Sequence, residues 1–181
     1  MSVLTDFFVA SDSEVNSIFQ KDNSLVATQQ TISENNVIKK VISKIFNSRK
    51  KSIEAKQDQF IFDISKFPYK SFKNVLVIEL SDLYKIITGE SSDKIYNEFS
   101  KFAVEPLPND EIGLHKFPPD FVRALSILNQ IDEIATKWSK TEEFELDNVQ
   151  PYELQEIIEA LRELSQVAVA KNKNLYLYWS L

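Results

Sequence analysis

The chain ends in Leu175-Tyr176-Leu177-Tyr178-Trp179-Ser180-Leu181, a run in which leucines alternate with aromatic residues. Successive side chains of a β-strand point to opposite faces, so the leucines and Trp179 would share one face and the two tyrosines the other. A terminal strand of this composition is normally buried. We therefore expect the C-terminus to be held within a sheet.

A second strand is predicted at the other end of the chain, over residues 2–10. Its alternation places Val3, Thr5, Phe7 and Val9 on one face and Leu4, Asp6 and Phe8 on the other. Ser11 then begins a short helix, with Glu14 at the capping-box position. Both termini are thus expected to contribute strands to one sheet.

The rest of the chain alternates between helical and extended patterns. Apolar residues at helical spacing predict helices over about 33–56, 75–88 with Gly89 as its cap, 120–139, and from the cap Asn148 to about Lys171. Residues 75–80 also have the composition of a strand, but the helical spacing and Gly89 favour the helix. Further strands are predicted at 60–64, 102–105 and 113–117, and a loop at 140–147. The pattern indicates a single α+β domain over residues 1–181, with a small mixed or antiparallel sheet that includes both terminal strands. About four to five helices would pack on it, mostly on one face.

The 181-residue composition excludes several classes of functional site. The two glycines, Gly89 and Gly113, are too far apart for a phosphate-binding loop, and the single histidine and absence of cysteine leave no set of ordinary zinc or thiolate ligands. We therefore expect no cofactor, no metal and no catalytic constellation. The composition favours a protein that is not an enzyme.

The sequence also bears on localisation. No apolar run approaches the length of a membrane span, and the first residues lack the basic region of a secretory signal. The absence of cysteine suits a reducing compartment. These features predict a cytoplasmic protein without a membrane partner.

The net charge of −6 conceals two opposed segments. Residues 36–73 hold ten basic and three acidic residues, for a net charge of +7, whereas residues 132–163 hold ten acidic and three basic residues, for −7. Both segments can be solvated helix faces. They can also pair within the fold, pair between two copies, or meet a charged partner.

Charged side chains in these segments are the candidate interaction residues: Lys39, Lys40, Lys44, Lys50, Lys51, Glu142 and Glu143. The lysines belong to a predicted basic amphipathic helix over 33–56, which could meet phosphates. However, the whole protein is acidic and the segment lacks interleaved aromatic residues, so nucleic acid is not the expected partner. The acidic residues near 142–147 lack an EF-hand pattern and fit a solvated connection between helices.

Two interpretations of function remain from the residues alone. The first is a non-enzymatic module that binds a protein partner or a second copy, as a regulator or an immunity-like protein. The alternative is a carboxylate-based hydrolase in which Asp6, Glu142 or Glu143 meet in a cleft. The single histidine, His115, fits a packing role in a strand.

Three stretches resemble the YfbM-like group of uncharacterised bacterial proteins. They are Met1–Phe19; Leu83-Tyr84-Lys85-Ile86-Ile87-Thr88-Gly89; and the closing pattern Phe117-Pro118, Trp138, Glu142-Glu143-Phe144 and Leu175–Leu181. The basic segment from about residue 23 to 60 has no counterpart in that pattern. The resemblance implies an α+β fold, and it carries no activity, cofactor or functional residue.

Overall fold

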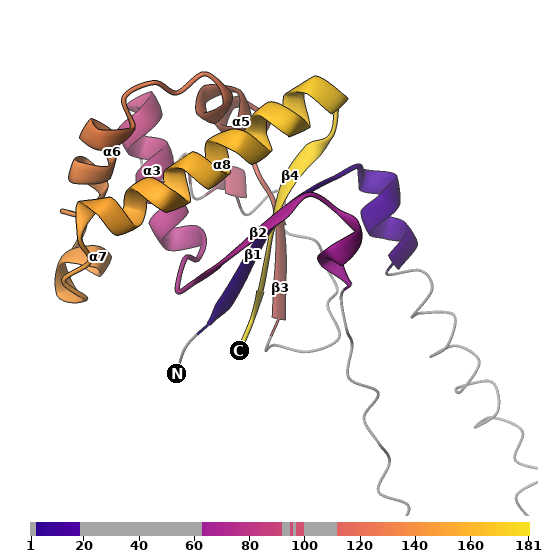
Figure 1. The fold of residues 1–181 in the computed structure, drawn as a ribbon, viewed down its shortest axis with the longest axis horizontal. Helices are drawn as coiled ribbons and strands as arrows, with labels where there is room; N and C mark the ends of the chain where they lie inside the picture. The colour runs from indigo at the N-terminus through magenta and orange to yellow at the C-terminus, as the bar shows by residue number, and fades with distance from the viewer. Residues whose placement is uncertain (1–2, 19–62, 92–94, 96, 100–111) are drawn as a thin grey trace, which may run out of the picture. The chain divides into compact units, whose positions relative to one another are not determined.

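The computed structural model describes residues 3–18, 63–91, 95, 97–99 and 112–181 (Figure 1). The chain divides into one unit of residues 1–12 and 63–181 and another of residues 13–62. Residues 12–18 are helical, as predicted. The predicted helix over 33–56 and the predicted strand at 102–105 lie outside the described residues.

Among the described residues of the first unit, four antiparallel strands form one sheet. They are β1 (Leu4–Ala10), β2 (Tyr69–Lys73), β3 (Ile112–Lys116) and β4 (Asn174–Ser180), in the order β2-β1-β4-β3. The two terminal strands are the central pair, and they are in register from Leu4 opposite Ser180 to Ala10 opposite Asn174. This confirms the α+β prediction and the place of both termini in the sheet.

The helices of this unit pack on one face of the sheet (Figure 1). Those whose bounds the structure describes are α3 (Val77–Thr88), α5 (Pro119–Ser126), α6 (Ile131–Trp138), α7 (Glu142–Leu146) and α8 (Pro151–Lys171). The core between the layers includes Phe7 and Val9 of β1 and Leu175 and Leu177 of β4, as the alternation predicted. The side chains of Phe8 and Tyr176 are buried on the opposite face, where their rings stack at 5.2 Å.

Trp138 connects α6 to α3 within the helical layer. Its side chain is fully buried at the end of α6, and its Nε1–H donates to the carbonyl oxygen of Glu79 in α3 at 2.9 Å. A buried tryptophan combines a large apolar surface with one donor that needs a partner, and both requirements are met here. The start of α3 is thereby fixed against the end of α6.

Three predictions are wrong in the helical layer. The single helix predicted over 120–139 is two helices, α5 and α6, because each buries its own apolar face on either side of a break at residues 127–130. The loop predicted over 140–147 contains α7, because Phe144 is buried against Trp138. Asn148 does not cap α8; it adopts a left-handed turn (φ 53°), and Gln150 is the N-cap.

Two further differences concern the segment before α3. Residue Ile64, predicted to end a strand, begins the 3-10 turn Ile64–Lys66, whose cap Asp63 accepts from the Ser65 N–H. Strand β2 follows, although no pattern predicted it. Two of its five residues are lysines, and only Phe72 is partly buried, so tertiary pairing with β1 rather than local composition determines its conformation.

Candidate functional site

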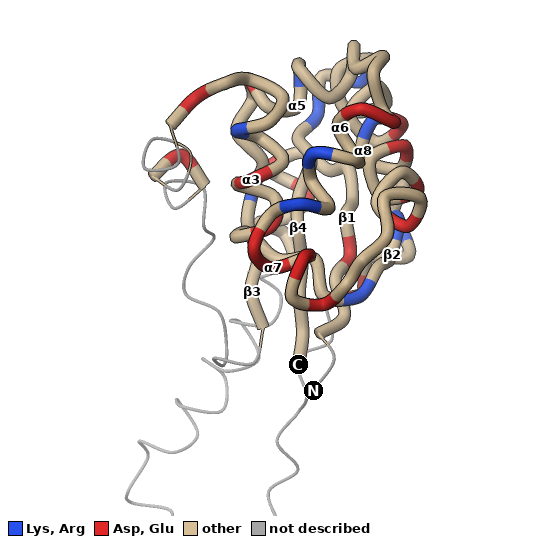
Figure 2. Tube along the Cα trace, turned by 90° about the vertical axis from the view of Figure 1, so that its left-hand side faces the viewer, with Lys and Arg blue, Asp and Glu red and all other residues tan. Residues whose placement is uncertain are grey.

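Four carboxylates lie on and directly after α7. They are Glu142, Glu143, Glu145 and Asp147, and residues 141–147 contain no basic residue. Figure 2 shows these acidic positions in red along the short helix. Glu142 and Glu143 stand in the first turn, where acidic side chains interact favourably with the helix dipole, whereas Asp147 at the C-cap does not have this advantage. The structure thus corrects the predicted acidic loop to an acidic helix.

Helix α3 brings two more carboxylates to the same place. The carboxylate of Glu79 accepts from the Leu76 N–H at 2.8 Å, which closes the start of the helix. Burial raises the pKa of Glu79, and the charges of Glu143 and Asp82 raise it further. Burial and then the nearby Glu143 likewise raise the pKa of Asp82, and the opposing effect of Lys85 is smaller. The carboxylates of α3 and α7 therefore repel one another across the contact between the two helices.

Exposed apolar side chains stand among these charges. Leu146 is 79% exposed and Ile78 is 54% exposed, although both are large and apolar. Ile78 shares a helix face with Asp82, and Leu146 shares one with Glu143, since residues three or four apart are neighbours on a helix. We call the six carboxylates and these two apolar residues the α7 acidic surface; its members are Ile78, Glu79, Asp82, Glu142, Glu143, Glu145, Leu146 and Asp147.

The α7 acidic surface is held rigidly by the core beneath it. The ring of Phe144 packs edge-on against Trp138 at 5.0 Å. The Thr141 hydroxyl donates to the carbonyl of Trp138 at 2.9 Å, and the Val149 N–H donates to the carbonyl of Phe144 at 3.0 Å. Hydrogen bonds thus hold both ends of α7 in place, and the acidic side chains project from a well-anchored backbone.

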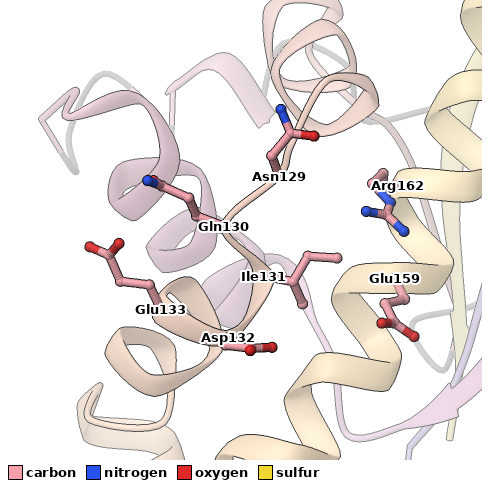
Figure 3. A pocket seen from close by; sticks show the side chains of 7 residues that line it. All are labelled: Asn129, Gln130, Ile131, Asp132, Glu133, Glu159 and Arg162. Carbon is pink, nitrogen blue, oxygen red and sulfur yellow. The ribbon is translucent and has the colours of Figure 1, made fainter.

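A shallow hollow of about 380 Å³ lies between the start of α6 and the middle of α8 (Figure 3). Figure 3 shows Ile131 pointing toward α8, where Glu159 and Arg162 lie. The other lining residues are Asn129, Gln130, Asp132 and Glu133. Glu133 already pairs with Lys137 at 2.7 Å. Three carboxylates and one guanidinium give the hollow a negative balance, but its lining contains neither a serine nor a histidine for nucleophilic catalysis.

The carboxylates of the hydrolase alternative do not meet. Asp6 is buried on β1, and its carboxylate accepts from the hydroxyl of Ser71 in β2. Its neighbour Phe7 points into the core under the helices, so Asp6 points to the opposite face of the sheet. Glu142 and Glu143 stand on the helical side. The predicted cleft between Asp6 and these glutamates is therefore not formed.

A second polar cluster gathers around Asp12. Its carboxylate accepts from the Tyr176 hydroxyl, from Lys116 Nζ at 3.2 Å and from Asn174 Nδ2 at 3.1 Å. The Tyr176 hydroxyl is the largest influence that lowers the pKa of Asp12, and Lys116 and Asn174 lower it further. Burial and the same contact raise the pKa of Tyr176. The cluster joins the ends of β3 and β4 to Asp12, which is a structural role.

The remaining predicted site residues have separate outcomes. Lys39, Lys40, Lys44, Lys50 and Lys51 lie outside the described residues. His115 lies in β3, as predicted, opposite Leu177. Within the described part of the chain, no group of three or more acidic or histidine side chains is arranged to hold a metal ion. None of the helices described is long and apolar enough to cross a membrane.

No protein-family model matches this sequence, and comparisons with curated proteins and with solved structures give no match either. The resemblance to the YfbM-like group therefore stays a prediction.

Proposed function

We propose that this protein is a cytoplasmic, non-enzymatic interaction module, a regulator or an immunity-like protein, and that it binds a basic protein segment through the α7 acidic surface. The observation that carries the proposal is the exposure of Leu146 and Ile78 among six carboxylates. Interfaces combine apolar contacts, which supply affinity, with complementary charges, which supply specificity and fast association.

The electrostatics of the surface favour a basic partner. Burial and mutual repulsion disfavour the charged forms of Glu79 and Asp82 in the protein as it stands. A lysine or arginine placed between α3 and α7 would relieve the repulsion between these carboxylates. This relief would contribute to the free energy of binding. The rigid mounting of α7 lowers the entropy cost of forming the complex.

The proposal can be tested by using three immobilised forms of this protein to capture binding partners from an extract of the native host. The wild-type protein, the Ile78→Ser/Leu146→Ser variant and an Ile127→Ser/Val169→Ser control are immobilised in parallel. The control removes two other exposed apolar side chains, 75% and 51% exposed, that lie outside the α7 acidic surface. We expect one protein with a basic binding segment to be retained by the wild type and the control and lost by the first variant. Equal retention of every captured protein by all three baits contradicts the proposal.

A further inference from the structure

Strand β2 lies at one edge of the described sheet, with β1 as its neighbour. Two backbone hydrogen bonds fix which of its peptide groups face β1. The Val9 N–H donates to the carbonyl of Pro68, and the Asn74 N–H donates to the carbonyl of Val3, each at 3.0 Å. In an antiparallel pair, alternate residues point both backbone groups to the same neighbour. The backbone N–H and C=O groups of residues 70, 72 and 74, and the C=O of Pro68, thus point toward β1.

The other residues of β2 point their backbone groups outward. Tyr69, Ser71 and Lys73 direct their N–H and C=O away from β1, and the side chains of all three are exposed. An exposed edge of this kind is a template for another strand. Lysines on an edge normally discourage such pairing. The positions of Lys70 and Lys73 therefore decide which partner strand the edge accepts.

We infer that β2 pairs with β2 of a second copy of this chain, antiparallel, around a two-fold axis at Ser71, so that two sheets join into one. Ser71 is the middle residue of the strand, so this register pairs all five residues. It also places Ser71 of both copies as a hydrogen-bonded pair, which the outward N–H and C=O of Ser71 permit.

In this register, the side chains of β2 are complementary to those of β2 in the second copy. Lys70 lies opposite Phe72 of the second copy, and Tyr69 lies opposite Lys73 of the second copy, so each lysine meets an aromatic ring and no lysine meets a lysine. A two-fold axis at Lys70 or at Lys73 would instead place like charges directly opposite each other. Lys70 keeps its ion pair with Glu163 of α8, because both residues belong to the same copy.

A cysteine at the axis tests the arrangement directly. The chain has no cysteine, so any disulfide of the Ser71→Cys variant must join two chains. The two Cα atoms would be about 5.5 Å apart, within the range of disulfide bonds. We expect this variant to form a cross-linked dimer on mild oxidation much faster than a cysteine placed elsewhere on the surface. The control Ile127→Cys, which is highly exposed elsewhere on the chain, should cross-link slowly. Equal cross-linking of both variants overturns the inference.

Charge substitutions provide a second test that retains Ser71 and its bond to Asp6. By sedimentation equilibrium, we expect the wild type to dimerise. The Tyr69→Lys variant, which sets a new lysine opposite Lys73 of the second copy, should weaken the dimer about tenfold. The double variant Tyr69→Lys/Lys73→Glu should restore it.

Two results of the sedimentation experiment overturn the inference: a wild type that stays monomeric at every concentration, or a double variant that dimerises no more tightly than the single one. The Ile78→Ser/Leu146→Ser variant should dimerise normally, because neither residue lies on β2. This separates the test of the dimer from that of the proposed function.

Discussion

At the scale of single residues, Gly113 shows how one missing methyl group determines packing. Gly113 lies opposite Trp179 in the β3–β4 pair, and a Cβ at this position would overlap the indole ring. We therefore expect Gly113→Ala to lower the free energy of unfolding by about 1–3 kcal/mol, because the tryptophan must move. Urea denaturation measures the change. A Gly113→Ala protein as stable as the wild type would show that Trp179 does not cover Gly113.

The contact of Tyr176 with Asp12 makes a second prediction at this scale. Tyr176→Phe removes the main group that lowers the pKa of Asp12, so that pKa should rise toward its ordinary value. We expect a loss of about 0.5–1 kcal/mol at pH 7, a small value because Asp12 is largely exposed. A lowered folded-state pKa stabilises the protein above the unfolded-state pKa, and this stability disappears as pH falls through the folded-state value.

Two measurements check the Tyr176→Phe prediction. NMR titration of the Asp12 carboxyl carbon gives its pKa in both proteins, and urea denaturation compares their stability at neutral pH and in acid, below the lowered pKa. The stability difference should shrink at the lower pH. An unchanged Asp12 titration would show that the hydroxyl does not govern this carboxylate. The contact was not predictable from sequence, because Asp12 and Tyr176 are 164 positions apart and neither lies in a recognisable motif.

At the scale of elements, carboxylates repel one another across the contact between α3 and α7. The pKa of Asp82 is raised by burial and by Glu143, so the charged carboxylate destabilises the fold at neutral pH. We expect Asp82→Asn to increase the free energy of unfolding by about 0.3–0.5 kcal/mol at pH 7, a modest gain because Asp82 is partly solvated. The gain should fade as pH falls through the raised pKa, where the wild-type carboxyl is also neutral.

The matched control for Asp82→Asn is Asp120→Asn. Asp120 pairs with Arg123 on α5, so neutralising it removes an attraction instead of a repulsion, and no gain in stability is expected. Chemical denaturation at neutral pH and in mild acid distinguishes the two variants. If Asp82→Asn behaves like Asp120→Asn, the repulsion between α3 and α7 is not significant.

Sequence patterns were sufficient to predict some of the helices and strands but not others. Strong periodicity predicted β1, β4 and α8, and Gly89 marked the end of α3, where it adopts a left-handed conformation (φ 72°). The acidic character of residues 142–147 was visible in the sequence. The helical form of that segment was not, because it depends on the burial of one residue, Phe144, against Trp138. Strand β2 was missed because its pairing with β1 is long-range.

At the scale of the whole molecule, the fold gathers charge that the net value of −6 conceals. Acidic residues of α3 and α7 meet in the helical layer, and the strands of the described sheet carry few of them (Figure 2). A concentrated electrostatic field of one sign accelerates the association with an oppositely charged partner. Salt screens this field, so the effect is smaller at high ionic strength. We therefore expect the association rate of the complex to fall as ionic strength rises.

The decisive measurement is the affinity of the captured partner for a protein in which charges of the α7 acidic surface are reversed. We expect Glu142→Lys/Glu143→Lys to weaken binding by about tenfold or more at about 50 mM salt, because two attractive charges become repulsive. The loss should be smaller at about 300 mM salt, where screening is stronger. An affinity that is the same for wild-type and charge-reversed protein at low salt would contradict the assignment of the α7 acidic surface as the binding site.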